Sequence, residues 1–508
     1  MEGDISTNSR RVARNTVILY FRMLLLMFIG LFTSRMVLKA LGVEDYGTYG
    51  AVGGIVTIFT VITSSISQSI GRYITFELGK DEPDRLRRIF STGVVMQLLF
   101  CAVVLVLTET LGRWWLNCRM QIPEGRLDAA NWVLQCSMGV LMVNLLSTPF
   151  NATIIAHEKM GAYAFISILE AALKLGVALL LCTTTADKLK CYAVLMLAVA
   201  VIIRAAYGAY CKAHFAESRG KLVFDRTLVS EMTRFAGWNC LGSGAYIINT
   251  QGVNQLVNVF FGVGANAARY VASQVETIVK QFVTNFLTAL NPQITKSYAS
   301  GNTEYCRELV CKGAKFSCLV MLFFIIPLIL EMPALLGLWL KDVPEGAVLF
   351  SRLVLIGLVA DMACNPLLTM IQATGRIKGY YIVTSATSVS VFLLSWAAFR
   401  MGADAHIPYI IFAAVYLIVD VEKAVYARKL SDFSISEFIR STVLPVTAVS
   451  VISLAVTLPV WYYIRPGWAR LICVVITSSI AVCASSWFTA LSTGERAFFK
   501  SHLKNVER

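Results

Sequence analysis

The run between residues 269 and 291 carries the clearest cluster of ionisable side chains. A set of its polar residues recurs at steps of three, four and seven positions: Arg269, Ser273, Glu276, Lys280, Thr284 and Asn291. These steps keep the side chains on one face of a helix. Arginine and lysine on such a face bind anions, and arginine binds phosphate through paired hydrogen bonds. Glu276 and Lys280 are also spaced for an ordinary i, i+4 pair, but Arg269 then lacks an acid on its own helix. We therefore favour a face that lines a water-filled cavity.

The segment before this run, residues 246–261, places amides inside an apolar stretch. Amides buried among apolar groups need hydrogen-bond partners, and Gly252 in their midst is a candidate for a helix break. We expect the cavity to be lined by polar groups from both segments, namely Asn249, Gln251, Asn254, Ser273, Glu276 and Thr284.

The first apolar run, which begins near residue 15, is interrupted by Arg22 and Arg35. At 1.5 Å per residue the two arginines are roughly 20 Å apart along a helix. Arg35 can extend to the outer surface, and Arg22 can extend inward, but we favour a cavity position for Arg22. With Arg269 and Lys280 they predict a cationic site spanning both halves of the chain. Its expected ligand is an anionic headgroup, a phosphate or a pyrophosphate.

Asp361 and Asp420 are isolated acids in apolar segments. Either is a candidate for binding a proton or Na⁺, whereas a partner such as Arg352 would make Asp361 structural. Both alternatives stay open. Glu170 and Lys174, four residues apart, are interpreted as an intrahelical salt bridge.

The composition requires these groups to sit in membrane helices. Of 508 residues, 57% are hydrophobic and 15% charged, and the mean hydropathy is +0.66. Apolar stretches of about 20 residues recur about fourteen times along the chain, which predicts an all-α polytopic membrane protein. Lys and Arg favour alternate loops, so the net charge of +14 indicates topology rather than a nucleic-acid partner, with both termini in the cytoplasm. The dispersed histidines and cysteines indicate no metal site, and the sequence has no phosphate-binding loop. We expect a transporter without cofactors, not an enzyme.

The two halves of the chain match weakly at a shift of about 220 residues. Gly42-Val43 matches Gly262-Val263, and Ile74-Thr75 matches Ile294-Thr295; at a slip of two further residues, Gly79 matches Gly301. Parallel repeats are an established transporter plan. We expect two six-helix lobes, residues 1–230 and 231–432, with helices 13 and 14 and a tail in residues 433–508.

Several stretches resemble a known family: "TSRMVLKALGVEDYGTYGAVGGIV", "ITFELGK", "STPFNATIIAHEKMGAYAFISILEAALKL" and "NPQITKSYASGN". They are similar to the polysaccharide-transporter branch of the multidrug/oligosaccharidyl-lipid/polysaccharide (MOP) exporter superfamily, and especially to O-antigen or lipopolysaccharide-biosynthesis flippases. The resemblance covers essentially the whole chain and weakens toward its C-terminal end.

This resemblance implies alternating access of two lobes that move an undecaprenyl-pyrophosphate-linked oligosaccharide across the bacterial cytoplasmic membrane. We expect a monomer with polysaccharide polymerase machinery as a candidate partner; H⁺ and Na⁺ are candidate coupling ions, and whether a gradient drives transport stays open. The positions that fit the family's cationic cavity are Arg22, Arg35, Arg72, Arg269 and Lys280. The alternative is a cation-coupled multidrug exporter, but such a protein favours an acidic, aromatic cavity, and the basic excess here argues against it.

Overall fold

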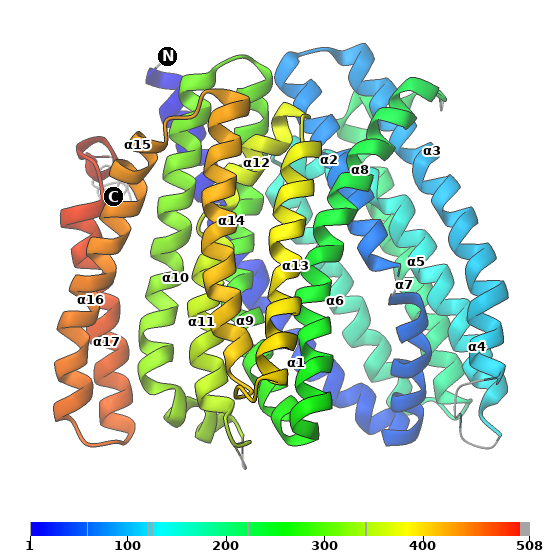
Figure 1. The fold of residues 1–508 in the computed structure, drawn as a ribbon. Coiled ribbons are helices and arrows are strands. Elements are labelled where there is room, and N and C mark those ends of the chain that lie inside the picture. The colour runs from blue at the N-terminus through cyan, green and yellow to red at the C-terminus, as the bar shows by residue number, and fades with distance from the viewer. Residues whose placement is uncertain are drawn as a thin grey trace, which may run out of the picture. The chain divides into compact units, whose positions relative to one another are not determined.

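The computed structural model describes residues 2–57, 59–118, 122, 125–220, 223–340 and 343–497, and in these residues all regular structure is helical (Figure 1). The predicted all-α membrane fold is confirmed. The helices up to the middle of the chain are α1 (Glu2–Thr57), α2 (Thr60–Lys80), α3 (Pro83–Leu107), α4 (Arg113–Cys118), α5 (Leu127–Ala156), α6 (Met160–Thr183), α7 (Lys188–His214) and α8 (Arg226–Ile247). They are followed by α9 (Val253–Ala299), α10 (Thr303–Trp339), α11 (Ala347–Met362), α12 (Asn365–Thr374), α13 (Lys378–Arg400), α14 (Ile407–Ser431), α15 (Ile435–Phe438), α16 (Leu444–Tyr463) and α17 (Trp468–Ser485).

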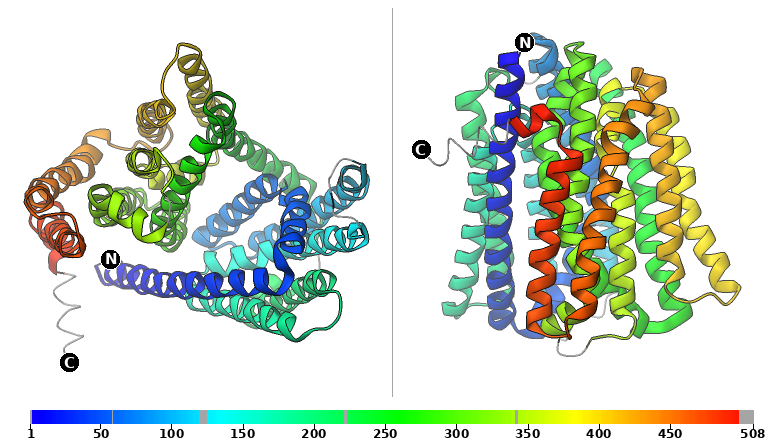
Figure 2. Two further views of the ribbon diagram at one scale, coloured as in Figure 1. Left: turned by 90° about the horizontal axis from the view of Figure 1, so that it is seen from below. Right: turned by 90° about the vertical axis from the view of Figure 1, so that its left-hand side faces the viewer.

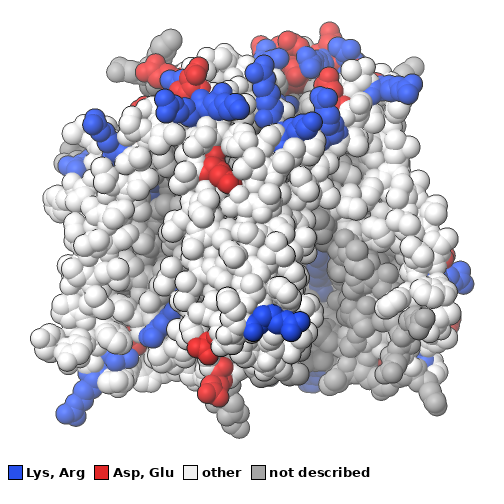
Figure 3. Space-filling view, in the orientation of Figure 1, with Lys and Arg blue, Asp and Glu red and all other residues white. Residues whose placement is uncertain are grey.

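Within the described part of the chain, 10 helical segments are long and apolar enough to cross a membrane. The remaining long helices, α2, α8, α9 and α14, carry more polar or charged residues and are not among these segments. Together the two groups are consistent with about fourteen spans. On the face shown in Figure 3, charged side chains gather toward the helix ends and leave few charges between them. This is the pattern expected of helices that cross hydrocarbon.

The chain divides into two compact units, Met1–Cys240 and Leu241–Arg508. The second unit includes the hairpin of α16 and α17. The finer division at residues 230 and 432 stays a prediction.

In the first unit, α5 packs against α7, and α1 packs against α6. The main core is apolar and includes Ile70, Ile74, Phe90, Phe150 and Ile154. In Figure 2, α1 runs as one long rod before it bends near residue 42.

Both units contain a helix that breaks at a glycine in an unusual backbone conformation. Gly42 interrupts α1 with φ 79° and ψ 170°, and Gly262 interrupts α9 with φ 78° and ψ −168°. Such angles are essentially restricted to glycine. Gly252 is helical instead, with φ −62°, so the break that we considered there lies further along, at Gly262. A second pair of left-handed residues follows, Asp81 with φ 58° and Gly301 with φ 78°.

These pairs define the register of the repeat. Gly42 and Gly262 are 220 positions apart, and so are Asp81 and Gly301. The helices that follow also begin 220 positions apart, at Pro83 and Thr303. The slip of two residues that matched Gly79 with Gly301 is therefore wrong, because the structural equivalent of Gly301 is Asp81.

In the second unit, α9 packs against α10 and α11, and the hairpin of α16 and α17 packs against α10 (Figure 2). Two ion pairs fasten this hairpin region to α10. Arg470 pairs with both carboxylate oxygens of the fully buried Glu331, with Nε–Oε1 at 2.7 Å and Nη2–Oε2 at 3.1 Å. Near the other end of α10, Lys315 Nζ lies 2.8 Å from Glu495 Oε2 and donates to the Ala490 carbonyl at 3.0 Å.

Candidate functional site

A pocket in the first unit lies between α1 and α6 and has a cavity volume of about 370 Å³. This volume falls within the usual range of about 300–1,000 Å³ for small-molecule sites. Its polar lining consists of Arg22, Thr33, Ser34, Tyr46, Ser167, Glu170, Lys174 and Tyr192. On α6, the polar residues recur at steps of three and four, so one face of this helix supplies Ser167, Glu170 and Lys174.

Arg22 is held by an aromatic residue of α6. Its guanidinium carbon lies 4.4 Å from the centre of the Tyr163 ring, and Nη2 donates to the Tyr163 hydroxyl at 3.3 Å. The buried Nε has no hydrogen-bond partner among the described residues, and no described acid pairs with Arg22. The guanidinium therefore retains charge and donors for a ligand that enters the pocket.

Glu170 and Lys174 form the predicted intrahelical pair, with Nζ–Oε1 at 2.6 Å. Both side chains are 39% exposed, and exposed pairs of this spacing contribute only about 0.2–0.5 kcal/mol. The pair therefore presents its charges to the pocket rather than fixing the helix.

The structure places the other predicted cations of the first unit away from this pocket. Arg35 is exposed on α1 and does not line it. Arg72 lies on α2 among aromatic rings, 4.7 Å from the ring centre of Tyr73, 4.6 Å from Phe76 and 5.4 Å from Phe235. The first unit thus brings Arg22 together with Lys174, which the sequence interpretation left outside the site.

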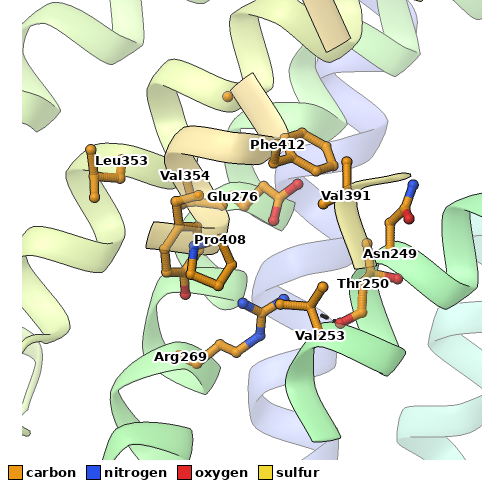
Figure 4. A pocket seen from close by; sticks show the side chains of 12 residues that line it. Asn249, Thr250, Val253, Arg269, Glu276, Leu353, Val354, Val391, Pro408 and Phe412 are labelled. Carbon is orange, nitrogen blue, oxygen red and sulfur yellow. Dashed lines mark hydrogen bonds between the residues drawn. The ribbon is translucent and has the colours of Figure 1, made fainter. Parts of the chain in front are cut away.

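The second unit has a smaller cavity of about 40 Å³ lined by Arg269, Glu276, Asn249 and Thr250 together with apolar residues. Figure 4 shows the Arg269 guanidinium directed at Thr250, whose carbonyl accepts from Nη2 at 3.1 Å. At about 10–15 Å³ per water, this cavity holds roughly three water molecules. In this conformation it is too small for a headgroup.

Asn249 is buried in the wall of this small cavity, where its amide lies close to the Tyr416 hydroxyl. Water in the cavity can satisfy the remaining donors and acceptors of this amide.

Lys280 forms an ion pair between helices. Its Nζ donates to Asp361 Oδ2 on α11 at 2.8 Å and to the Tyr246 hydroxyl on α8 at 2.9 Å. Within the described residues Glu276, one turn earlier on α9, does not share this contact. Lys280 therefore does not form the i, i+4 pair with Glu276 that we considered. It pairs with Asp361 instead, between α9 and α11.

The interpretation of Asp361 and Asp420 as isolated acids is wrong. Asp361 pairs with Lys280, while Arg352 donates instead to the carbonyl of Ile329 at 2.7 Å. Asp420 pairs with Lys423 on the next turn of α14 at 2.9 Å. The spacing of Asp420 and Lys423 in the sequence was a sufficient signal for that pair.

The remaining polar residues predicted to line the cavity lie outside it. Gln251, Ser273 and Thr284 are exposed and Asn254 is half-buried. Ser273 donates to the Tyr270 carbonyl and Thr284 to the Lys280 carbonyl, at 2.8 and 2.9 Å. Tyr163 and Tyr246, which hold Arg22 and Lys280, were missed, because a tyrosine in an apolar helix gives no sign of which cation it contacts.

A family model described as "Polysaccharide biosynthesis protein" matches residues 12–298, and no curated protein matches the chain. Solved structures resemble the fold. A MATE protein in the bent conformation aligns with TM-score 0.70 and 11% identity over 83% of this chain and 95% of that one. A MOP superfamily transporter from Pyrococcus furiosus, described by a reversed polarity of its binding pocket that suggests a different function, aligns with TM-score 0.68 and 12% identity over 85% and 96%. A MATE multidrug resistance transporter in an outward-facing conformation aligns with TM-score 0.66 and 12% identity over 83% and 95%. At these identities the likeness shows the fold alone.

Proposed function

The chain belongs to the polysaccharide biosynthesis protein family of the MOP superfamily, and from this we propose that it is a flippase for lipid-linked oligosaccharides. Its cargo is an undecaprenyl-pyrophosphate-linked repeat unit for O-antigen, capsular or exopolysaccharide synthesis. The pocket in the first unit carries the proposal, because it combines a usable volume with an arginine that has no acidic partner among the described residues.

The charge balance of that pocket supports an anionic cargo. Arg22 and Lys174 face a single acid, Glu170, so the polar wall is cationic. A phosphate suits Arg22, since the guanidinium donates in paired fashion to phosphate oxygens. An exporter of cationic drugs needs the opposite balance, and this observation disfavours it.

The proposed transport cycle is alternating access in the bacterial cytoplasmic membrane, by a monomer with both termini in the cytoplasm. The headgroup binds from the cytoplasmic side, the protein changes conformation and the headgroup leaves on the other side, while the polyprenyl tail stays in lipid. Arg269 and Lys280 are proposed as further contacts for the headgroup, with Arg35 and Arg72 on its path.

Coupling to H⁺ or Na⁺ through Asp361 or Asp420 is part of the proposal. Each carboxylate is paired with a lysine, so an added cation must compete with an ammonium group. Flipping measured with and without imposed H⁺ and Na⁺ gradients tests this coupling.

The central experiment measures flipping of a fluorescent polyprenyl-pyrophosphate oligosaccharide in proteoliposomes. Arg22→Gln should reduce the rate about tenfold or more, since a charge-assisted phosphate contact is lost. Arg113→Gln is the control, because Arg113 is a largely exposed arginine outside the pocket. Normal flipping by Arg22→Gln would remove this pocket from the transport path, and no flipping by the wild type would favour the drug-exporter alternative.

A further inference from the structure

The pocket in the first unit is elongated, since its lining on α1 extends from Arg22 to Val37. The helices α1 and α6 run in the same direction along it. Arg22 contacts Tyr163 at one level, and Val37 packs with Ala178 at another. The step from Arg22 to Val37 on α1 and the step from Tyr163 to Ala178 on α6 are both 15 residues, so the two helices run in parallel. Lys174 lies 11 residues beyond Tyr163, which at 1.5 Å per residue places it roughly 16 Å further along the axis.

The two ends of the pocket therefore differ in chemistry. The end at Arg22 offers a guanidinium for a phosphate. Further along, Glu170 and Lys174 form a pair with no net charge. Lys174 has three donors and spends one on Glu170 Oε1, and among the described residues Glu170 Oε2 accepts no hydrogen bond. The pair thus presents adjacent donors and an acceptor.

Hydroxyl groups and aromatic rings surround this pair. Thr33 and Ser167 line the pocket. Thr33 donates to the Ile29 carbonyl and Ser167 to the Tyr163 carbonyl, both at 2.8 Å. Tyr192 also lines the pocket and is fixed edge-on against Tyr49, with ring centres 4.7 Å apart. A carboxylate, an ammonium group and an aromatic ring together match a neutral sugar, whose hydroxyls both donate and accept.

We propose that the Glu170–Lys174 pair binds the sugar that follows the phosphate, with two neighbouring sugar hydroxyls donating to Glu170 Oε2 and accepting from Lys174 Nζ. This inference rests on the proposed function, because it assumes that the phosphate occupies the end of the pocket at Arg22. The pair is then the determinant of sugar specificity, and Arg22 is the determinant of lipid-phosphate binding.

The test compares binding of two lipids to the purified protein in nanodiscs: polyprenyl pyrophosphate without sugar, and the same lipid carrying a neutral hexose. The hexose should tighten binding to the wild type. Glu170→Gln should abolish that gain, a loss of about tenfold, since a hydrogen bond to a charged acceptor is removed, and it should leave the sugar-free lipid unchanged. Arg22→Gln should weaken both lipids equally.

Glu308→Gln is the matched control. Glu308 and Lys312 form the same i, i+4 pair on α10, 2.5 Å apart and with exposures of 43% and 34%, so loss of an equivalent pair elsewhere should change neither affinity. Tighter binding of the sugar-free lipid to Glu170→Gln would overturn the proposal, because Glu170 would then be a competing anion for Lys174. An unchanged gain from the hexose in Glu170→Gln would also overturn it. Failure of the wild type to bind either lipid would instead refute the proposed function.

Discussion

Lys280 Nζ lies 2.8 Å from Asp361 Oδ2, which joins α9 to α11 across the second unit. Lys280 is 29% exposed and Asp361 11% exposed, so both charges are largely withdrawn from solvent. The Glu170–Lys174 pair is more exposed, with both side chains at 39%, so the two lysines differ in how strongly their ion pairs are shielded from solvent. Removing one partner of a buried pair strongly destabilises the folded state, because the other charge is left buried and unpaired. The pair on α6 is weak enough to engage a ligand.

Asp361→Ala should destabilise the protein by about 3 kcal/mol, the lower end of the range for an unpaired buried charge, since Lys280 retains some contact with solvent. The double variant Lys280→Met with Asp361→Leu should be much closer to wild type. Thermal unfolding in detergent measures both. Equal losses from the single and double variants would show that the pair matters through packing rather than charge.

Gly42→Ala and Gly262→Ala should each cost on the order of 1–3 kcal/mol, because both glycines adopt angles that a β-carbon strains. Neither site has a heavy atom within 4 Å of the added carbon, so the cost is one of backbone conformation. Gly176→Ala on α6 has equal space and lies inside a regular helix, where alanine should be neutral or stabilising by up to about 1 kcal/mol. Melting temperatures that do not distinguish the three variants would contradict the assigned break.

Tyr163→Phe should impair headgroup binding only slightly, because the ring remains beneath Arg22 and only the 3.3 Å hydrogen bond is lost. Tyr163→Leu removes the cation–π contact as well. That contact contributes about 0.5–2 kcal/mol depending on its exposure, so affinity for the lipid pyrophosphate should fall by roughly 2- to 30-fold. Titration of both variants in nanodiscs measures this, and a larger loss in Tyr163→Phe than in Tyr163→Leu would refute the positioning role.

Glu217 predicts a pH dependence of stability. Burial alone would raise its pKa, but the hydrogen bond with His157 at 2.7 Å and a backbone hydrogen bond lower the pKa below its ordinary value near 4.5. Because the folded-state pKa is depressed, this stabilisation is present above pH 4.5 and is lost as the pH falls through the folded-state value.

The wild type should therefore lose melting temperature relative to Glu217→Gln as the pH is lowered from about 5 to about 3.5, since glutamine does not titrate. Parallel curves for the two proteins across this range would exclude Glu217 as the group responsible.

Much of the fold was predictable because its determinants are local. Helices in hydrocarbon must satisfy their own backbone groups, so recurrent apolar stretches of sufficient length identify spans without reference to neighbours. The glycine breaks were visible as the match of Gly42 with Gly262, although their positive φ was not. The true register at Asp81 was hidden because one copy of the repeat has glycine and the other does not.

The membrane-helical class and the duplication could be predicted from the sequence, since recurrent apolar stretches and a repeated pattern are properties of the chain alone. The tertiary structure decided which charges meet. Lys280 pairs with Asp361, 81 positions away, and Arg22 contacts Tyr163, 141 positions away. Spacing within a helix carries no information about such partners. It also decided that Lys174 shares a pocket with Arg22, because a polar face identifies an exposed stripe but not the helix that packs opposite it.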